Sequence, residues 1–125
     1  MGKYDQRVKM NEYVVHCFKA SLTKDELSVR TIKKHIENAE LYLDFLAFNL
    51  EKDYKEGVQS DCLSQFFGYH LIYKCGFKAN AMKEMSASLK KFYQYLLNNN
   101  EISSSDYKEM KFVLKDHLED WIEEA

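Results

Sequence analysis

The sequence predicts an all-α fold, a single-domain bundle of about five helices, and three observations support this prediction. Proline is absent and glycine occurs only four times, so little interrupts long helices. Apolar residues recur along most of the chain at alternating spacings of three and four, which is the helical period. A chain of 125 residues is long enough for one sizeable core, whereas two domains would each fall near the lower size limit. We therefore expect residues 1–125 to form one helical domain.

Two helices are predicted in the first fifty residues. The first, before residue 22, is suggested by Val8, Val14, Cys17 and Phe18. The second begins after Ser28, a good N-cap, and continues for about 22 residues. Its main apolar stripe consists of Ile32, Ile36, Ala39, Leu43, Leu46 and Leu50.

A second apolar stripe lies on the nearly opposite side of this long helix and contains Leu41, Phe45 and Phe48. The C-terminal half of the helix must therefore be covered from two directions. In the interpretation we favour, it is the central helix of the bundle. In the other interpretation, the three residues form an interaction surface for another subunit or a protein partner.

In the second half of the chain, the sequence predicts a polar loop and three more helices. The loop, residues 52–59, is followed by a helix with an apolar pattern of Leu63, Phe66, Phe67, Leu71 and Ile72. Gly76 suits the left-handed position after this helix. Asn80 is expected to cap the next helix, which ends at residues 98–100 and forms a hairpin with the preceding one. Its stripe contains Met82, Met85, Leu89, Phe92 and Leu96.

The last helix is predicted within residues 104–125, with Ser105 as its cap. Its inward stripe contains Tyr107, Met110, Leu114, Leu118 and Trp121. This segment is acidic, since it has three lysines against seven acidic residues.

Composition restricts the classes of function. The chain is 46% hydrophobic and 30% charged, which is typical of a globular protein, and its net charge of −2 argues against a strongly basic nucleic-acid coat. The three cysteines, Cys17, Cys62 and Cys75, are expected to be reduced core residues. The chain shows neither the apolar run of a signal peptide nor a bilayer-spanning segment, so we expect a cytoplasmic protein without a membrane partner.

The chain lacks the local signatures of catalysis. It contains no nucleophile elbow, zinc-protease motif, Walker loop or dinucleotide-binding glycine motif. His16 with Cys17, and His70 with Cys75, do not have the spacing of a zinc site. We therefore predict no catalytic residue, cofactor, metal or small-molecule substrate, and an enzyme is the weaker class of function.

Two strings nevertheless resemble a known family. They are Ser28-Val-Arg-Thr31-Ile32 leading into Tyr42-Leu43-Asp44-Phe45-Leu46, and Ser86-Ala-Ser-Leu89-Lys-Lys-Phe92-Tyr93-Gln-Tyr95-Leu96. Together they resemble the first and last helices of the SAM-like, N-terminal core-binding domain of tyrosine recombinases, the phage integrase family, over about residues 28–103. The resemblance implies a helical module that grips one side of a DNA duplex. Strand transfer is not predicted, because Arg7 and Arg30 are the only arginines and no His-x-x-Arg pair occurs.

The candidate DNA-binding residues are cations expected on the outer faces of the two resembling helices. They are Arg30, Lys33 and Lys34 on the first, and Lys83, Lys90 and Lys91 on the second. Cations so placed could neutralise phosphates of double-stranded DNA, although an ordinary solvated surface is the other interpretation of each. Glu37, Glu40 and Asp44 continue the face of the first helix with the opposite sign.

The predicted function is thus a non-catalytic DNA-binding module, accessory to DNA integration or recombination. The alternative is a helical protein-interaction or self-association module. It would use the stripe of Leu41, Phe45 and Phe48, or the acidic last helix, without binding nucleic acid.

Overall fold

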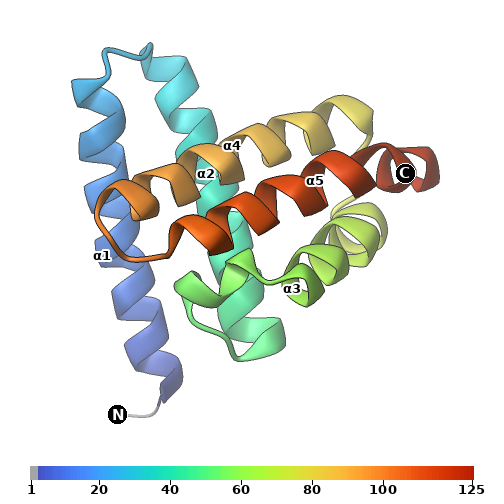
Figure 1. The fold of residues 1–125 in the computed structure, drawn as a ribbon, viewed down its shortest axis with the longest axis horizontal. Helices are drawn as coiled ribbons and strands as arrows, with labels where there is room; N and C mark the ends of the chain where they lie inside the picture. The colour runs from blue at the N-terminus through green and yellow to red at the C-terminus, as the bar shows by residue number, and fades with distance from the viewer. Residues whose placement is uncertain (1–2) are drawn as a thin grey trace.

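The computed structural model describes the backbone of residues 3–125 and the side chains of residues 6–125, and this part of the chain is helical with no strand (Figure 1). The elements are α1 (Lys3–Lys24), α2 (Val29–Phe45), the π-helix η1 (Leu46–Leu50), the 3₁₀-helix η2 (Tyr54–Val58), α3 (Ser60–Gln65), the π-helix η3 (Phe66–Lys74), α4 (Ala79–Asn98) and α5 (Ser104–Glu124). The predicted all-α bundle is confirmed. No helix within residues 3–125 is long and apolar enough to cross a membrane.

Two antiparallel helix pairs cross each other in the fold. One pair is α1 with α2, and the other pair is α4 with α5. The second pair lies across α2 in the view of Figure 1. The short α3 and η3 pack against α5. The predicted hairpin of residues 63–75 with α4 is wrong, because the main neighbours of α4 are α2 and α5.

Helix ends agree in part with the sequence. Ser28 caps α2 by accepting a hydrogen bond from the Thr31 amide at 3.1 Å, and Gly76 has a positive φ of 67°. The predicted caps Asn80 and Ser105 are wrong. The side chain of Ser103 caps α5, and α4 already begins at Ala79 without a side-chain cap.

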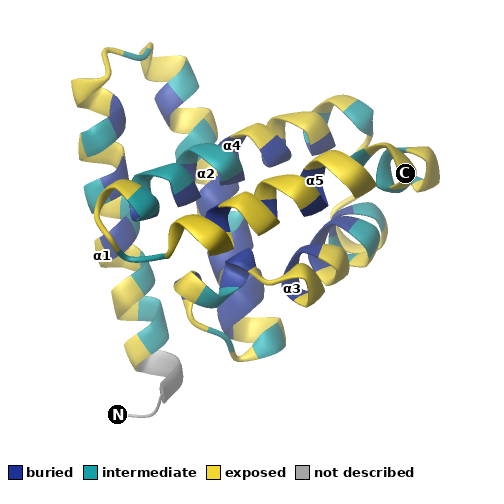
Figure 2. Ribbon diagram, viewed as in Figure 1, coloured by how far each residue is buried: buried dark blue, intermediate teal, exposed yellow. Residues whose placement is uncertain are grey.

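Figure 2 shows buried positions along the inward sides of the helices, and large aromatic side chains occupy many of them. The fully buried ones are Phe18, Tyr42, Phe66, Phe67, Phe92 and Tyr93. At the far end of α5, the ring of Trp121 stacks on Phe67 with centroids 5.2 Å apart and passes over Gly68. The three cysteines are free, and Cys62 is buried as expected, whereas Cys75 is exposed.

The segment 52–59, expected to be a polar loop, is instead a 3₁₀-helix with three buried residues, and two core tyrosines hold it. Tyr42 donates its hydroxyl hydrogen to the carbonyl of Gly57 at 2.6 Å, and Tyr93 donates to the carbonyl of Tyr54 at 2.7 Å. A Cβ atom on Gly57 would collide with the Tyr93 hydroxyl, the Tyr42 ring and Leu46. Glycine is therefore required there, since the backbone approaches the rings so closely.

We expect Tyr93→Phe to lower the free energy of unfolding by about 1–2 kcal/mol, because the carbonyl of Tyr54 would lose its partner in a buried place. Urea denaturation measures this change. Tyr73→Phe is the matched control, since the Tyr73 ring is exposed, and it should alter stability by less than about 0.5 kcal/mol. Equal effects of the two changes would contradict the role assigned to Tyr93.

Candidate nucleic-acid interface

A groove with a volume of about 490 Å³ runs between the first turns of α2 and the first half of α4. It is lined by Arg30, Thr31, Lys33, Lys34, His35 and Glu37 from α2, and by Glu84, Ala87 and Ser88 from α4. Three of the six predicted DNA-binding residues therefore line one concave surface. We call this surface the α2–α4 groove.

The start of α2 adds to the positive potential of the groove. Residues 30, 33, 34 and 37 project to the same side because they are three or four positions apart. The first turn of α2 contains no acidic residue that would offset the positive end of the helix dipole. Arg30 is exposed there and has no carboxylate within 4.0 Å among residues 6–125.

The other two cations of the groove are paired with carboxylates. Lys34 Nζ lies 3.1 Å from Glu84 Oε2, and Lys33 Nζ lies 3.9 Å from Glu37 Oε1. All four side chains are at least half exposed. Exposed pairs of this kind contribute about 0–1 kcal/mol, so an incoming phosphate can replace either carboxylate at little cost.

A buried polar cluster forms one side of the groove and joins α2 to α4. His35 Nδ1 lies 2.8 Å from Ser88 Oγ, and Asn38 donates to the same oxygen at 2.9 Å. Burial lowers the pKa of His35, and the positive charge of Lys91 lowers it further. Lys91 itself is not among the residues that line the groove. The Ser88 hydroxyl is not presented to solvent, because the residue is only 1% exposed.

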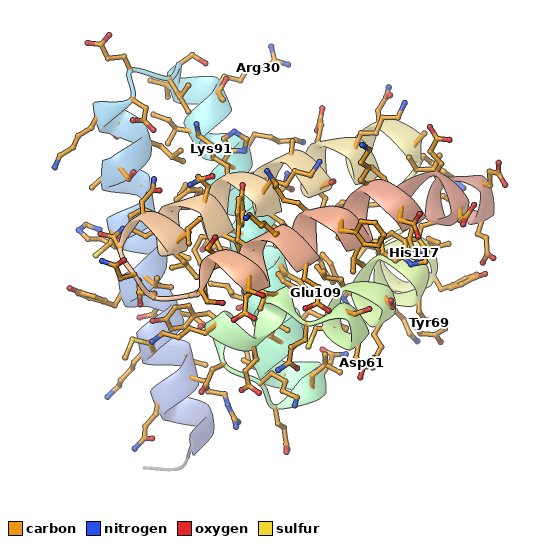
Figure 3. The ribbon with its side chains drawn as sticks, viewed as in Figure 1. Arg30, Asp61, Tyr69, Lys91, Glu109 and His117 are labelled. Atoms are coloured by element: carbon orange, nitrogen blue, oxygen red, sulfur yellow. The ribbon has the colours of Figure 1, made fainter. Side chains whose placement is uncertain are left out.

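The six predicted cations do not form a single face, which corrects the sequence interpretation. Lys83 and Lys90 do not line the groove. They are seven positions apart and so share one side of α4, and the backbone carbonyl of Lys90 accepts a hydrogen bond from the Tyr107 hydroxyl of α5 at 3.3 Å. The reason is helical geometry, since residue 91 is rotated by about 100° from residue 90. Figure 3 shows Arg30 and Lys91 in the upper part of the view, and the acidic Asp61 and Glu109 in the lower part.

The stripe proposed as an interaction surface is mostly internal. Phe45 is only 5% exposed, with its ring 5.1 Å from that of Phe66 and 4.7 Å from that of His70. Leu41 is half-buried against the core, and Phe48 is 49% exposed. An interaction surface built on Phe45 is therefore wrong, because Phe66 and His70 of η3 already cover this side chain. The favoured interpretation, a central helix covered from two directions, is confirmed.

Two groups of polar residues were missed by the sequence interpretation. The cluster of His35, Asn38 and Ser88 has no local signal, because its members come from helices about fifty positions apart. Lys108, Lys111 and Lys115 lie on one flank of α5, which was considered only as an acidic helix. Their spacing of three and four could have revealed them.

Comparison with protein-family models, curated proteins and solved structures gives no match for this chain. Within the described residues, no group of three or more His, Cys, Asp or Glu side chains is placed to hold a metal ion. The α2–α4 groove is our candidate site because it brings together three of the predicted DNA-binding residues.

The buried imidazole predicts a pH dependence of stability. The pKa of His35 is lowered from its ordinary value of 6.5, so below that pH the unfolded chain binds more protons than the folded one. Stability should therefore fall as the pH falls below the ordinary value, and His70, whose pKa burial also lowers, contributes with the same sign. His35→Gln should reduce the difference in unfolding free energy between about pH 7.5 and about pH 5.5. An unchanged difference in the His35→Gln protein would contradict the role assigned to this imidazole.

Phe45→Ala should lower the free energy of unfolding by about 3–5 kcal/mol, because it empties a buried aromatic site. Phe48→Ala, three positions along the same stripe, should cost about 1 kcal/mol or less, since half of that side chain is exposed. Urea denaturation compares the two variants. A Phe45→Ala protein of native stability that had lost self-association would restore the interaction-surface interpretation.

Proposed function

We propose that this chain is a non-catalytic DNA-binding module whose α2–α4 groove contacts the sugar–phosphate backbone of double-stranded DNA. The observation that carries the proposal is the convergence of Arg30, Lys33 and Lys34 on one groove. Lys91 does not line the groove, but its positive charge acts on His35 and so adds to the positive potential there. Guanidinium and ammonium groups gathered in this way suit the phosphates of a nucleic-acid strand.

The charge balance of the groove supports binding to a polyanion. Its three lining cations, Arg30, Lys33 and Lys34, outnumber the two lining carboxylates, Glu37 and Glu84. Both carboxylates take part in exposed ion pairs, and replacing them with phosphates would release counterions from the DNA. This part of the affinity is independent of base sequence, so we propose binding through the backbone rather than through base edges.

The resemblance to the core-binding domain of tyrosine recombinases supports the same location. Its two strings lie within residues 28–46 and 86–96, which include much of the two helices that line the groove. Because the catalytic signature of that family is not in this sequence, the proposed role in DNA integration or recombination is accessory. A cytoplasmic location belongs to the same proposal.

A double charge reversal tests the proposal. We expect the wild type to bind a DNA duplex with a slope of log affinity against log salt of about −3, one unit per cation that lines the groove. Arg30→Glu with Lys34→Glu should weaken binding at least tenfold at about 50 mM salt and reduce the slope to about −1, because two phosphate contacts are lost. Fluorescence anisotropy of a labelled duplex measures both quantities.

The matched control reverses two exposed lysines on other elements, Lys55 on η2 and Lys74 on η3. It changes the net charge equally and should weaken binding much less. Equal losses in both variants would show that only the net charge of the protein matters. No duplex binding by about 10 µM wild-type protein at about 50 mM salt would refute the proposal.

A further inference from the structure

The outward face of α5 is exposed and has no neighbour within residues 6–125. Figure 2 shows most of the visible side of this helix as exposed. Along the helix, one stripe at spacings of three and four contains Ser105, Lys108, Phe112, Lys115, Glu119 and Glu123. The Phe112 side chain in the middle of this stripe is 65% exposed.

Charge is ordered by sign along this stripe. Lys108 and Lys115 lie in its first half, whereas Glu119 and Glu123 lie in its second half. None of the four forms an ion pair within 4.0 Å among residues 6–125. The face is therefore complementary to a copy of itself running in the opposite direction.

The charges at the C-terminal end of α5 also favour a second helix that runs in the opposite direction. Its last turn contains no basic residue, although Glu123 and Glu124 lie next to the negative end of the helix dipole. Lysines and the positive end of an antiparallel helix placed beside this turn would offset both unfavourable charges.

We propose that two copies of this chain associate through the outward faces of α5, antiparallel about a two-fold axis that passes beside Lys115 and Asp116. This axis sets Lys108 of one copy opposite Glu123 of the second copy. It sets Phe112 opposite Glu119 of the second copy, where the ring can cover the aliphatic part of that side chain. The same contacts occur twice, as the symmetry of such an interface requires.

A nucleic acid is the less suitable occupant of this face. A phosphate strand that followed the lysines along α5 would next meet Glu119 and Glu123, which repel it, whereas a second, antiparallel α5 sets Lys108 against Glu123 at both ends of the contact. A 21-residue helix is about 30 Å long, so the contact is smaller than the ~800 Å² per partner of a stable complex. The dimer is therefore weak and sensitive to salt. It uses a different surface from the α2–α4 groove and does not depend on DNA binding.

Sedimentation velocity of charge-reversal variants tests this interface. The wild type at several hundred micromolar should dimerise at about 50 mM salt and dissociate at about 500 mM salt. Lys108→Glu with Lys115→Glu should lower the association constant on the order of tenfold or more, and Glu119→Lys with Glu123→Lys should do the same. In the variant with all four changes, glutamate and lysine face each other again with their positions exchanged. This variant should therefore dimerise as the wild type does. The double reversal of Lys55 and Lys74 is the charge-matched control, and circular dichroism verifies that each variant folds.

Each of the following outcomes would overturn the proposed dimer. A wild type that stays monomeric at low salt removes the dimer. A dimer that survives both double reversals, or that the fourfold variant does not restore, lies on another surface. A monomeric wild type whose duplex binding is lost on reversing Lys108 and Lys115 would assign these lysines to nucleic acid, and this result would leave the proposed function standing.

Discussion

Two phenol hydroxyls buried in the core impose the constraint on which the rest of the fold depends. Tyr42 and Tyr93 are fully buried, and burying an unpaired hydroxyl would cost about 1–3 kcal/mol each. Each hydroxyl donates to a carbonyl of the 54–58 segment, so this short 3₁₀-helix must lie against the middle of the bundle. Gly57 permits the approach, because any side chain there would displace the rings.

The same constraint determines where the groove lies. Tyr42 belongs to α2 and Tyr93 to α4, so both helices are fastened to one short segment as well as to each other. Farther along, the hydrogen bonds of His35 and Asn38 to Ser88 join the helices again. Two separate sets of hydrogen bonds thus fix the positions of the two helices that form the α2–α4 groove. The cations of the groove lie on these fixed helices rather than on loops.

Local patterns predicted the helices well because each helix buries a stripe with the helical period. The cap Ser28, the turn at Gly76 and the inward stripe of α4 all follow from such patterns. The packing partners did not follow, since the choice of α5 rather than η3 as the neighbour of α4 depends on contacts distant in sequence. For the site, residue types were predictable but their grouping was not. The groove includes Arg30, Lys33 and Lys34 but none of the three lysines predicted on α4, because which side of α4 faces α2 depends on contacts distant in sequence.

The stacking of Trp121 on Phe67 has a spectroscopic consequence. Trp121 is the only tryptophan of the chain, and it lies where the last turns of α5 meet η3. Its emission therefore reports the local environment of this one junction, free of any other indole. Partial detachment of the C-terminal end of α5 would shift that emission to longer wavelength while the helical circular dichroism signal changed little, so fraying and global unfolding can be distinguished in a single sample.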